Sequence, residues 1–351
     1  MDRRFQSSAS GFSSAGAAAA ERSEFRGMRA ILLSAGGYLA ALLPDHGANL
    51  ISLSYGPLRI LHTPPDEAAL LREPYSYGIP ILCPPNRIQD GSFVYKGKTF
   101  SFPPNTDDGA CLHGLLHCLP WRVELAEGRG GRAVVRLLCS GKTQPDIAAS
   151  FGENVDFRIQ YTLSPHGLSQ VFTVFNNESY ALPFGLSFHT AFRVPFAPYS
   201  RAENVLLRLP LQSRCRLDPE TGYPLRIDDP LDDFERKLAA EGYPPLAGPI
   251  DRLYRRDPAR PNEALLIDAF SGYEVRYRAG GLYRHWIIWN DDARHGFVGL
   301  EPQTWLSNAP CYAQRGETGL GMIDVPAGAG VSLSTSISAR RLTGARGGAQ
   351  I

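Results

Sequence analysis

The sequence has no excess of charge of either sign and no apolar run long enough to cross a membrane as a helix. Lys and Arg number 36 against 35 Asp and Glu, which gives a net charge of +1. This balance argues against a basic surface for nucleic acid or acidic lipid. The longest apolar stretch, residues 30–43, is shorter than the ~18 residues of a membrane span and is broken by Gly36 and Gly37. We therefore expect a protein that binds neither nucleic acid nor membranes.

Paired cysteine motifs are also missing. None of the six cysteines forms a Cys-x-x-Cys pair. Scattered cysteines in a chain of 351 residues are typical of free thiols in a reducing compartment, which predicts a cytoplasmic location. His113 and His117 have the spacing of two zinc ligands on a helix, but Gly114 and Pro120 disfavour a helix there. We expect no metal site and no cofactor.

Strand patterns dominate from Met28 onward, and helix signals are few. The chain contains 35 Gly and 28 Pro, which predicts frequent turns between short strands. Gly36-Gly37 and Lys96-Gly97 predict hairpin turns. Other strands are expected at residues 50–55, 133–138, 157–163, 168–175, 205–209, 265–269, 273–277, 285–289, 297–300 and 331–337, and helices at residues 66–72 and 232–240. This pattern predicts one large antiparallel β-sandwich over residues 28–345.

Two segments depart from the pattern. Residues 1–27 are rich in Ser, Ala and Gly without periodicity, so we expect a disordered leader or a tail of cloning origin, with Met28 as the natural start. Residues 218–260 are rich in Pro, Asp and Arg, and we expect them to form long loops over one rim of the sandwich. Binding residues usually lie on such loops above a rigid scaffold.

Glu301 lies in an apolar run, residues 296–304, at the point where Pro302 would stop the strand. Two histidines lie upstream, His113 and His189. A carboxylate and an imidazole of different proton affinity can move protons in opposite directions at once. This combination suggests an acid–base pair that opens and closes a sugar ring. From the residues alone, a solvated rim carboxylate and a structural histidine remain alternatives.

Arginine and tryptophan residues offer sugar contacts. Arg87 follows two prolines and an asparagine, which stiffen its backbone, and guanidinium donors fit paired sugar hydroxyls. Trp286 and Trp289 are three residues apart, so at most one of them can face a cleft from a strand. Trp305 is an alternative stacking platform for a sugar.

Four motifs, in order, resemble the aldose 1-epimerase (galactose mutarotase) family. They are Gly-Ala-Asn-Leu at residues 47–50, Gly-Ile-Pro-Ile-Leu-Cys-Pro-Pro-Asn-Arg-Ile at residues 78–88 followed by Tyr-Lys-Gly-Lys at 95–98 and His113-Gly114, Gly-Leu-Ser-Phe-His-Thr-Ala-Phe at 185–192, and Glu-Pro-Gln-Thr at 301–304. The resemblance implies a large antiparallel β-supersandwich with few short helices and a sugar site in a cleft across one sheet.

The same resemblance implies roles for particular residues. Glu301 would be the base that takes the proton of the anomeric hydroxyl, and His189 the acid that protonates the ring oxygen. Arg87, Asn86 and His113 would bind the sugar. Each member of the Glu301–His189 pair is expected to stabilise the charged form of the other, so that in the sugar complex the base is ionised and the acid protonated.

The family also uses an aspartate from a long loop. Asp251 is the best match, and Asp233 is its rival. The expected protein is a monomer or homodimer that acts on a monosaccharide.

Three functions are open at this stage. The first is an aldose 1-epimerase that interconverts the anomers of an aldohexose. The second is a hexose-6-phosphate 1-epimerase of the same fold, which would need extra cations from Arg193, Arg315 or the arginines near Asp251. The third is a carbohydrate-binding β-sandwich without catalysis.

Overall fold

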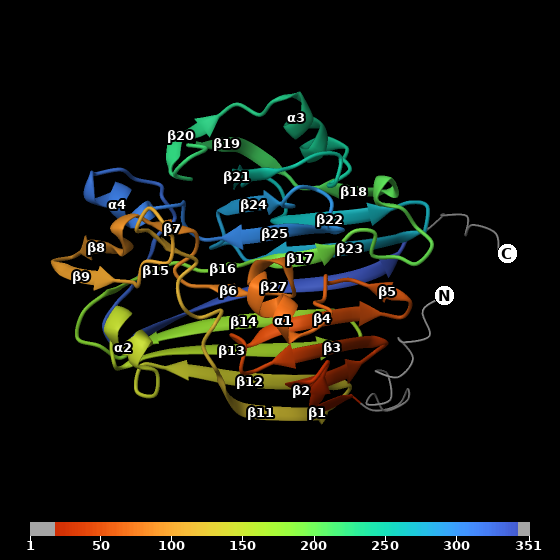
Figure 1. Cartoon of the computed structure of the whole chain (residues 1–351), viewed down its shortest axis with the longest axis horizontal. Helices are drawn as coiled ribbons and strands as arrows, with labels where there is room; N and C mark the ends of the chain where they lie inside the picture. The colour runs from red at the N-terminus through yellow and green to blue at the C-terminus, as the bar shows by residue number, and fades with distance from the viewer. Residues whose placement is uncertain (1–17, 343–351) are drawn as a thin grey trace.

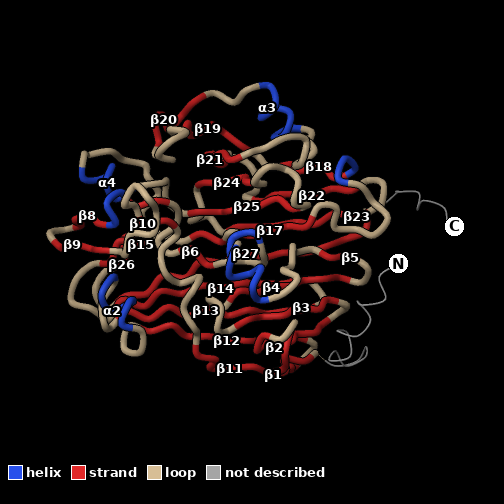
Figure 2. The backbone as a smooth tube through the Cα atoms, viewed as in Figure 1, coloured by secondary structure: helices blue, strands red, loops and turns tan. Residues whose placement is uncertain are grey.

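Antiparallel strands are the predominant regular structure in residues 18–342, the part of the chain that the computed structural model describes (Figures 1 and 2). The first large sheet has the order β11-β12-β13-β14-β27-β23-β22-β18. Its strands are β11 (Arg122–Arg129), β12 (Arg132–Ser140), β13 (Val155–Ser164), β14 (Gly167–Asn176), β27 (Ala329–Arg341), β23 (Tyr273–Ala279), β22 (Glu263–Asp268) and β18 (Val205–Arg208).

The second large sheet has the order β20-β19-β21-β24-β25-β16-β6, and β17 also pairs with β25. Its strands are β20 (Pro224–Asp229), β19 (Leu211–Leu217), β21 (Asp251–Arg256), β24 (His285–Trp289), β25 (Phe297–Gln303), β16 (Ser187–Phe188), β6 (Ile81–Leu82) and β17 (Thr190–Arg193). We call it the site sheet, because the candidate residues lie on it.

A third sheet forms from the first five strands in sequence order: β1 (Ala19–Phe25), β2 (Met28–Ala35), β3 (Tyr38–Leu43), β4 (Asn49–Tyr55) and β5 (Leu58–Arg59). Three strand pairs complete the set: β7 (Arg87–Ile88) with β10 (Cys111–Leu112), β8 (Ser92–Tyr95) with β9 (Lys98–Ser101), and β15 (Leu182–Phe184) with β26 (Ile323–Val325). The predicted hairpin turns at Gly36-Gly37 and Lys96-Gly97 are confirmed.

Four short α-helices lie within the described residues: α1 (Glu67–Arg72), α2 (Pro145–Ser150), α3 (Asp233–Ala240) and α4 (Ala309–Gln314). The two expected helices are confirmed as α1 and α3. Each begins where an aspartate side chain caps it, Asp66 for α1 and Asp232 for α3. The expected antiparallel β-supersandwich with few short helices is therefore confirmed.

One continuous core joins the three sheets. It includes Leu50 of the third sheet, Phe172 of the first large sheet and Trp286 of the site sheet. Buried hydrogen bonds tie the layers: the Tyr161 hydroxyl donates to the Ala48 carbonyl at 2.7 Å, and the Thr190 hydroxyl donates to the Tyr277 hydroxyl at 2.9 Å. The Thr190 contact shows which face of the site sheet meets the first large sheet. The alternate residues of the site sheet therefore point to its opposite face.

Two expectations about the chain are wrong. Part of the expected leader is structured, because Ala19–Phe25 pairs as β1 with β2 along its whole length. Residues 1–17 and 343–345, also covered by the expected boundaries, lie outside the described residues. The expected loop region, residues 218–260, contains the strands β20 and β21 in addition to the expected helix α3. The strands there contain charged residues, which conceal the apolar alternation expected of a strand. In the fold these charges are neutralised by partners, such as Arg255 by Asp228 at 2.8 Å.

Removal of β1 should weaken the fold. We expect a chain that begins at residue 28 to have a thermal midpoint a few degrees below that of a chain that begins at residue 18, because the deletion exposes the edge of β2 and frees Phe25 from its apolar cluster. A loss of about 1 kcal/mol in the free energy of unfolding corresponds to roughly 2–4 °C in a large domain. Differential scanning calorimetry of both chains is the measurement, and equal midpoints would show that β1 contributes nothing.

Candidate active site

An open cavity of about 680 Å³ lies on the outer face of the site sheet. Its floor comes from the sheet, and its walls come from segments that are far apart in the sequence. The lining residues are Tyr75, Asn86, Arg87, Leu112, His113, His189, Arg214–Glu220, Gly222, Asp251, Arg252, Ile287, Trp289 and Glu301. The cavity therefore brings together Glu301, His189, Arg87, Asn86, His113 and Asp251, as the sequence predicts.

Two neighbouring strands bring the acid–base pair into contact. Glu301 is the fifth residue of β25, and His189 lies between β16 and β17, which both pair with β25. The His189 backbone N–H donates to the Pro80 carbonyl at 3.0 Å, which fixes the turn into β17. His189 Nε2 lies 3.0 Å from Glu301 Oε1, and the two side chains are only 5% and 2% exposed. The pair is a single hydrogen-bonded unit at the cavity floor.

Burial controls the charge of this pair. Burial raises the pKa of Glu301 well above its usual range, and the carboxylate of Asp251 raises it further. Burial lowers the pKa of His189 to about 3. In the free protein, desolvation therefore favours the neutral form of both groups, and the charged pair expected in the sugar complex stays a prediction. Transfer of a proton from Glu301 to His189 across the 3.0 Å contact would generate that charged form.

A buried turn holds the arginine that the sequence singles out. Asn86 adopts a left-handed backbone conformation with φ of 58°, and its Oδ1 accepts hydrogen bonds from the Arg87 N–H at 2.9 Å and the Ser307 hydroxyl at 2.8 Å. The Arg87 carbonyl in turn accepts from the Asn308 N–H at 2.8 Å. Among residues 18–342, the ionic contact of the guanidinium is a long one to Asp108, 3.9 Å from Nη1, which leaves its donors available to a ligand.

His113 lies beside this turn because β10 pairs with β7, and its N–H donates to the Asn86 carbonyl at 2.9 Å. The next residue must be glycine. Gly114 has φ of 61°, and a Cβ there would lie 2.0 Å from the Cys83 carbonyl oxygen. Burial, with the nearby charges of His189 and His117, holds the pKa of His113 well below its usual range. A neutral imidazole at this position is suited to hydrogen bonding with sugar hydroxyls.

Asp251 enters the cavity from β21, opposite Trp289 of β24. Its carboxylate is open to the solvent of the cavity, yet the surrounding walls desolvate it enough to raise its pKa, which Arg87 partly counteracts. Its rival Asp233 lies elsewhere: it is the first residue of α3, its side chain is 99% exposed, and it forms an ion pair with Arg236. The structure therefore brings Asp251, and not Asp233, to the pair.

The three candidate tryptophans differ in whether they reach the cavity. Trp289 lines the cavity and its ring centroid lies 5.2 Å from that of His189, whereas Trp286 is fully buried in the core. The expectation that at most one of the two faces the cleft is confirmed. Trp305 is not a stacking platform, because it is 1% exposed and its indole N–H donates to the Pro85 carbonyl at 3.1 Å.

The sequence analysis missed one aromatic residue of the site. The ring centroid of Tyr75 lies 4.7 Å from that of His113 and 5.6 Å from that of His189. Its hydroxyl lies 3.2 Å from His117 Nε2, so His117 supports Tyr75. Tyr75 belongs to a single 3-10 turn, Pro74–Ser76, whose pattern resembles that of any surface turn. It comes near His113 only in three dimensions.

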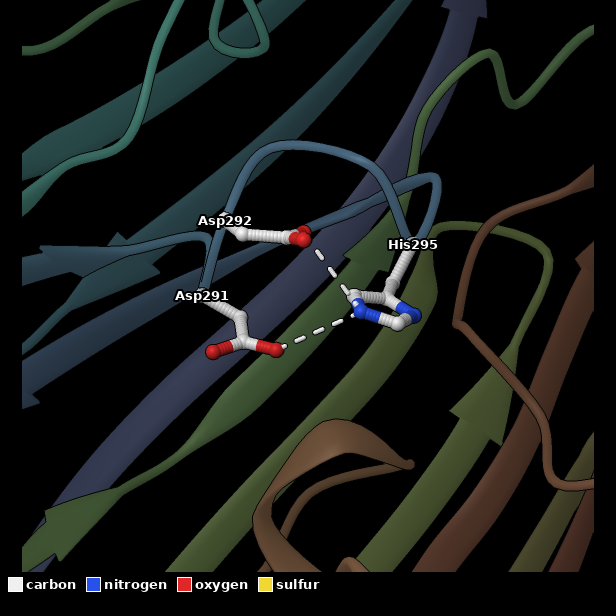
Figure 3. A group of neighbouring side chains, drawn as sticks. All are labelled: Asp291, Asp292 and His295. Atoms are coloured by element: carbon white, nitrogen blue, oxygen red, sulfur yellow. Dashed lines mark ion pairs between the residues drawn. The ribbon is translucent and has the colours of Figure 1, made fainter.

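A different cluster has the spacing of metal ligands. Within residues 18–342, Asp291, Asp292 and His295 are the one group of three such side chains whose ligand atoms lie within 4.8 Å of one another. His295 Nε2 lies 3.4 Å from one oxygen of each aspartate. Figure 3 marks these two ion pairs by dashed lines. The group sits on the loop between β24 and β25 and lines no part of the cavity. The cluster is therefore separate from the Glu301–His189 pair.

Comparisons with known proteins agree with this geometry. A galactose mutarotase-like protein from Clostridium acetobutylicum superposes with a TM-score of 0.86 at 24% identity, covering 93% of this chain and 99% of that one. The galactose 1-epimerase of Lactobacillus acidophilus gives a TM-score of 0.70 at 14% identity over 93% of this chain and 99% of its own. An aldose epimerase homologue from Caenorhabditis elegans gives 0.66 at 15% identity over 88% and 97%.

At these identities the likeness shows the fold, so the molecule is a galactose mutarotase-like β-sandwich protein with a buried Glu–His pair in its cleft. Residues 29–337 match the aldose 1-epimerase family. The chain belongs to that family, which supports an epimerase activity.

Two further findings concern the setting of the protein. All six cysteines are free thiols. No helix among the described residues is both long and apolar enough to span a bilayer.

Proposed function

We propose that the protein interconverts the α and β anomers of an unphosphorylated aldohexose by acid–base ring opening and reclosure. The observation that carries this proposal is the 3.0 Å contact between Glu301 and His189 at the floor of a polar cavity. Free sugars exchange anomers slowly because acid and base must arrive together. A fixed pair removes that entropic cost.

Glu301 and His189 together can carry out the proton transfers of ring opening. Proton transfer from Glu301 to His189 produces a carboxylate and an imidazolium. The carboxylate then removes the proton from the anomeric hydroxyl while the imidazolium protonates the ring oxygen, and the bond between C1 and the ring oxygen breaks. The open-chain aldehyde forms while Glu301 is protonated and His189 neutral, which is the arrangement that burial favours. Rotation about C1–C2 and the reverse transfers give the opposite anomer.

The remaining residues supply contacts to the sugar. Arg87 offers guanidinium donors, His113 offers a neutral imidazole, and Asp251 accepts hydrogen bonds from hydroxyls across the cavity. Trp289 presents an apolar surface beside His189 for the nonpolar face of the ring. These groups fix the anomeric carbon against the pair, which is the geometric requirement of the reaction.

The charges of the cavity favour a neutral sugar over a sugar phosphate. Arg193 and Arg315 are not among the lining residues. Three other arginines that line the cavity are paired with carboxylates: Arg252 with Glu235 at 2.7 Å, Arg214 with Glu235 at 3.2 Å and Arg216 with Asp229 at 3.3 Å. Their charges are thus already compensated within the fold. A phosphate group would have to compete with those carboxylates or take Arg87 from the sugar hydroxyls, so the 6-phosphate alternative is less well supported.

The test is anomer exchange measured by NMR over a panel of aldohexoses and their 6-phosphates. We expect acceleration of exchange for at least one unphosphorylated sugar, unchanged by addition of a chelator. Acceleration of the 6-phosphates alone would favour the second function. Binding of a sugar without any acceleration would favour the carbohydrate-binding module and contradict the proposal.

A further inference from the structure

A second row of polar side chains crosses the site sheet beside the acid–base pair. Gln303 of β25 pairs with Ser187 of β16 on one side and with His285 of β24 on the other. Directly opposite residues of antiparallel strands point to the same face of a sheet. The side chains of Ser187, Gln303 and His285 therefore form a continuous row, which we call the polar row.

The polar row points to the same face as the cavity. Gln303 follows Glu301 by two residues, so both side chains leave β25 on the same side. Ser187 likewise precedes the catalytic His189 by two residues. His285 precedes Ile287, which lines the cavity, by two residues. The polar row is therefore the next row along the strands from the pair.

All three members of the polar row are buried, with exposed fractions of 0% for Ser187 and Gln303 and 1% for His285. Within the part of the chain that the structure describes, neither polar atom of the Gln303 amide has a hydrogen-bond partner, and the same holds for Ser187 Oγ and His285 Nε2. Buried polar atoms are almost always paired, directly or through water. The concentration of unpaired atoms beside the reacting groups indicates a functional network.

Among residues 18–342, one carboxylate oxygen of Glu301 is also unpaired. Its Oε1 contacts His189, but its buried Oε2 has no partner among the described residues. An ionised carboxylate accepts hydrogen bonds at both oxygens and donates none. The base therefore needs a donor at Oε2 when it carries its charge.

Donors and acceptors in the polar row can be assigned without conflict. His285 Nδ1 lies 3.2 Å from the Thr304 carbonyl, which places the ring hydrogen on Nδ1 and leaves Nε2 as an acceptor. Burial supports this neutral form, because it lowers the pKa of His285 to about 3. No direct bond joins these side chains among the described residues, so we assign the links to bridging waters: one amide hydrogen of Gln303 can go toward His285 Nε2, and the Ser187 hydroxyl can donate toward the amide oxygen. The second amide hydrogen is left for Glu301.

We propose that Gln303 is a positioning residue of the acid–base pair, anchored by Ser187 and His285, whose amide donates a hydrogen bond to Oε2 of Glu301 directly or through one water. This inference rests on the proposed function in taking Glu301 as the base. The hydrogen bond stabilises the carboxylate against the opposing effects of burial and Asp251. It therefore increases the fraction of the pair that is charged and reactive.

The test replaces Gln303 by methionine, which keeps the volume and removes both polar atoms. Gln170→Met is the matched control: Gln170 is also fully buried, with an unpaired Nε2 among the described residues, but it lies on β14 of the other large sheet. The carboxyl of Glu301 is titrated by carbon-13 NMR, with its signal assigned from Glu301→Gln. Anomer exchange is measured on the same samples.

A hydrogen bond to the ionised form lowers a pKa, so its loss must raise it. We expect Gln303→Met to raise the pKa of Glu301 by about one unit or more and to slow anomer exchange about tenfold. Gln170→Met should change neither quantity, even if both variants lose similar thermal stability. An unchanged titration of Glu301 in folded Gln303→Met, or an equal shift in the control, would overturn the inference.

Gln303→Glu provides a second test if the methionine variant does not fold. It keeps the shape but replaces the amide donors by a second carboxyl group, so the pKa of Glu301 should rise at least as far. No rise in that variant would also overturn the inference. The titration separates the two proposals, because it reports on Gln303 even if the wild-type protein fails to exchange the anomers of any sugar.

Discussion

Glu301→Gln slows anomer exchange by about 10²–10⁴-fold, the usual effect of losing a general base. The amide has nearly the size of the carboxyl group, so the contact with His189 at 3.0 Å can persist while the proton acceptor is lost. Sugar binding should fall much less, because Arg87, His113 and Asp251 still line the cavity. The measurement is exchange spectroscopy at saturating sugar, with sugar affinity from calorimetry.

The matched control is Glu274→Gln. Glu274 is also buried, at 4% exposure, but it lies on β23 and pairs with Arg276 and Arg340. Its replacement should lower stability and leave the rate per folded molecule unchanged. Near wild-type exchange in folded Glu301→Gln would show that Glu301 is not the base.

His189→Asn should also depress turnover, by about 10²-fold or more, because the ring oxygen of the sugar loses its proton donor. The loss should appear in kcat more than in KM, since the donor acts in the transition state. The two residues share one proton, so the double variant with Glu301→Gln should cost less than the sum of the single losses on a logarithmic scale. The measurement is a double-mutant cycle, which compares the rates of the wild-type protein, the two single variants and the double variant.

His62→Asn serves as the control for this change. His62 also packs among aromatic rings, stacked on Tyr77 and Phe297, but it does not line the cavity. Its replacement should leave the rate of exchange intact. Fully additive losses in the double variant would mean that Glu301 and His189 act independently, and wild-type turnover in His189→Asn would remove it from the mechanism.

The sequence contained enough information to predict most residues of the candidate active site. Glu301 could be placed on a strand because its neighbours are apolar, and the motifs around His189 and Arg87 supplied the rest. Capping residues also made two helices predictable, since Asp66 and Asp232 each precede a helical pattern. These signals are local, so they can be recognised in the sequence without knowledge of the tertiary structure.

Features that depend on packing were not predictable. Strand β1 is largely polar and exposed, so its backbone pairing with β2 defines it and its side chains give little sign of a strand. Tyr75 reaches His113 through a turn far from it in sequence. The charge of the Glu301–His189 pair depends on the depth at which it is buried, and a sequence does not reveal that depth.

Two parts of the site sheet line the cavity, and they differ in how well they tolerate substitution. Glu301 stands on an inner strand whose neighbours hold it on both sides, whereas Asp218, Glu220 and Gly222 occupy the turn between β19 and β20 at the sheet's border. Substitutions in a border turn leave the inner ladder in register. Under the proposed function, variants of this turn can therefore change the sugar preference while leaving Glu301 and His189 in place. A library confined to residues 218–221 is the economical route to altered selectivity, because a Cβ at Gly222 would lie 2.7 Å from Arg87 Nε.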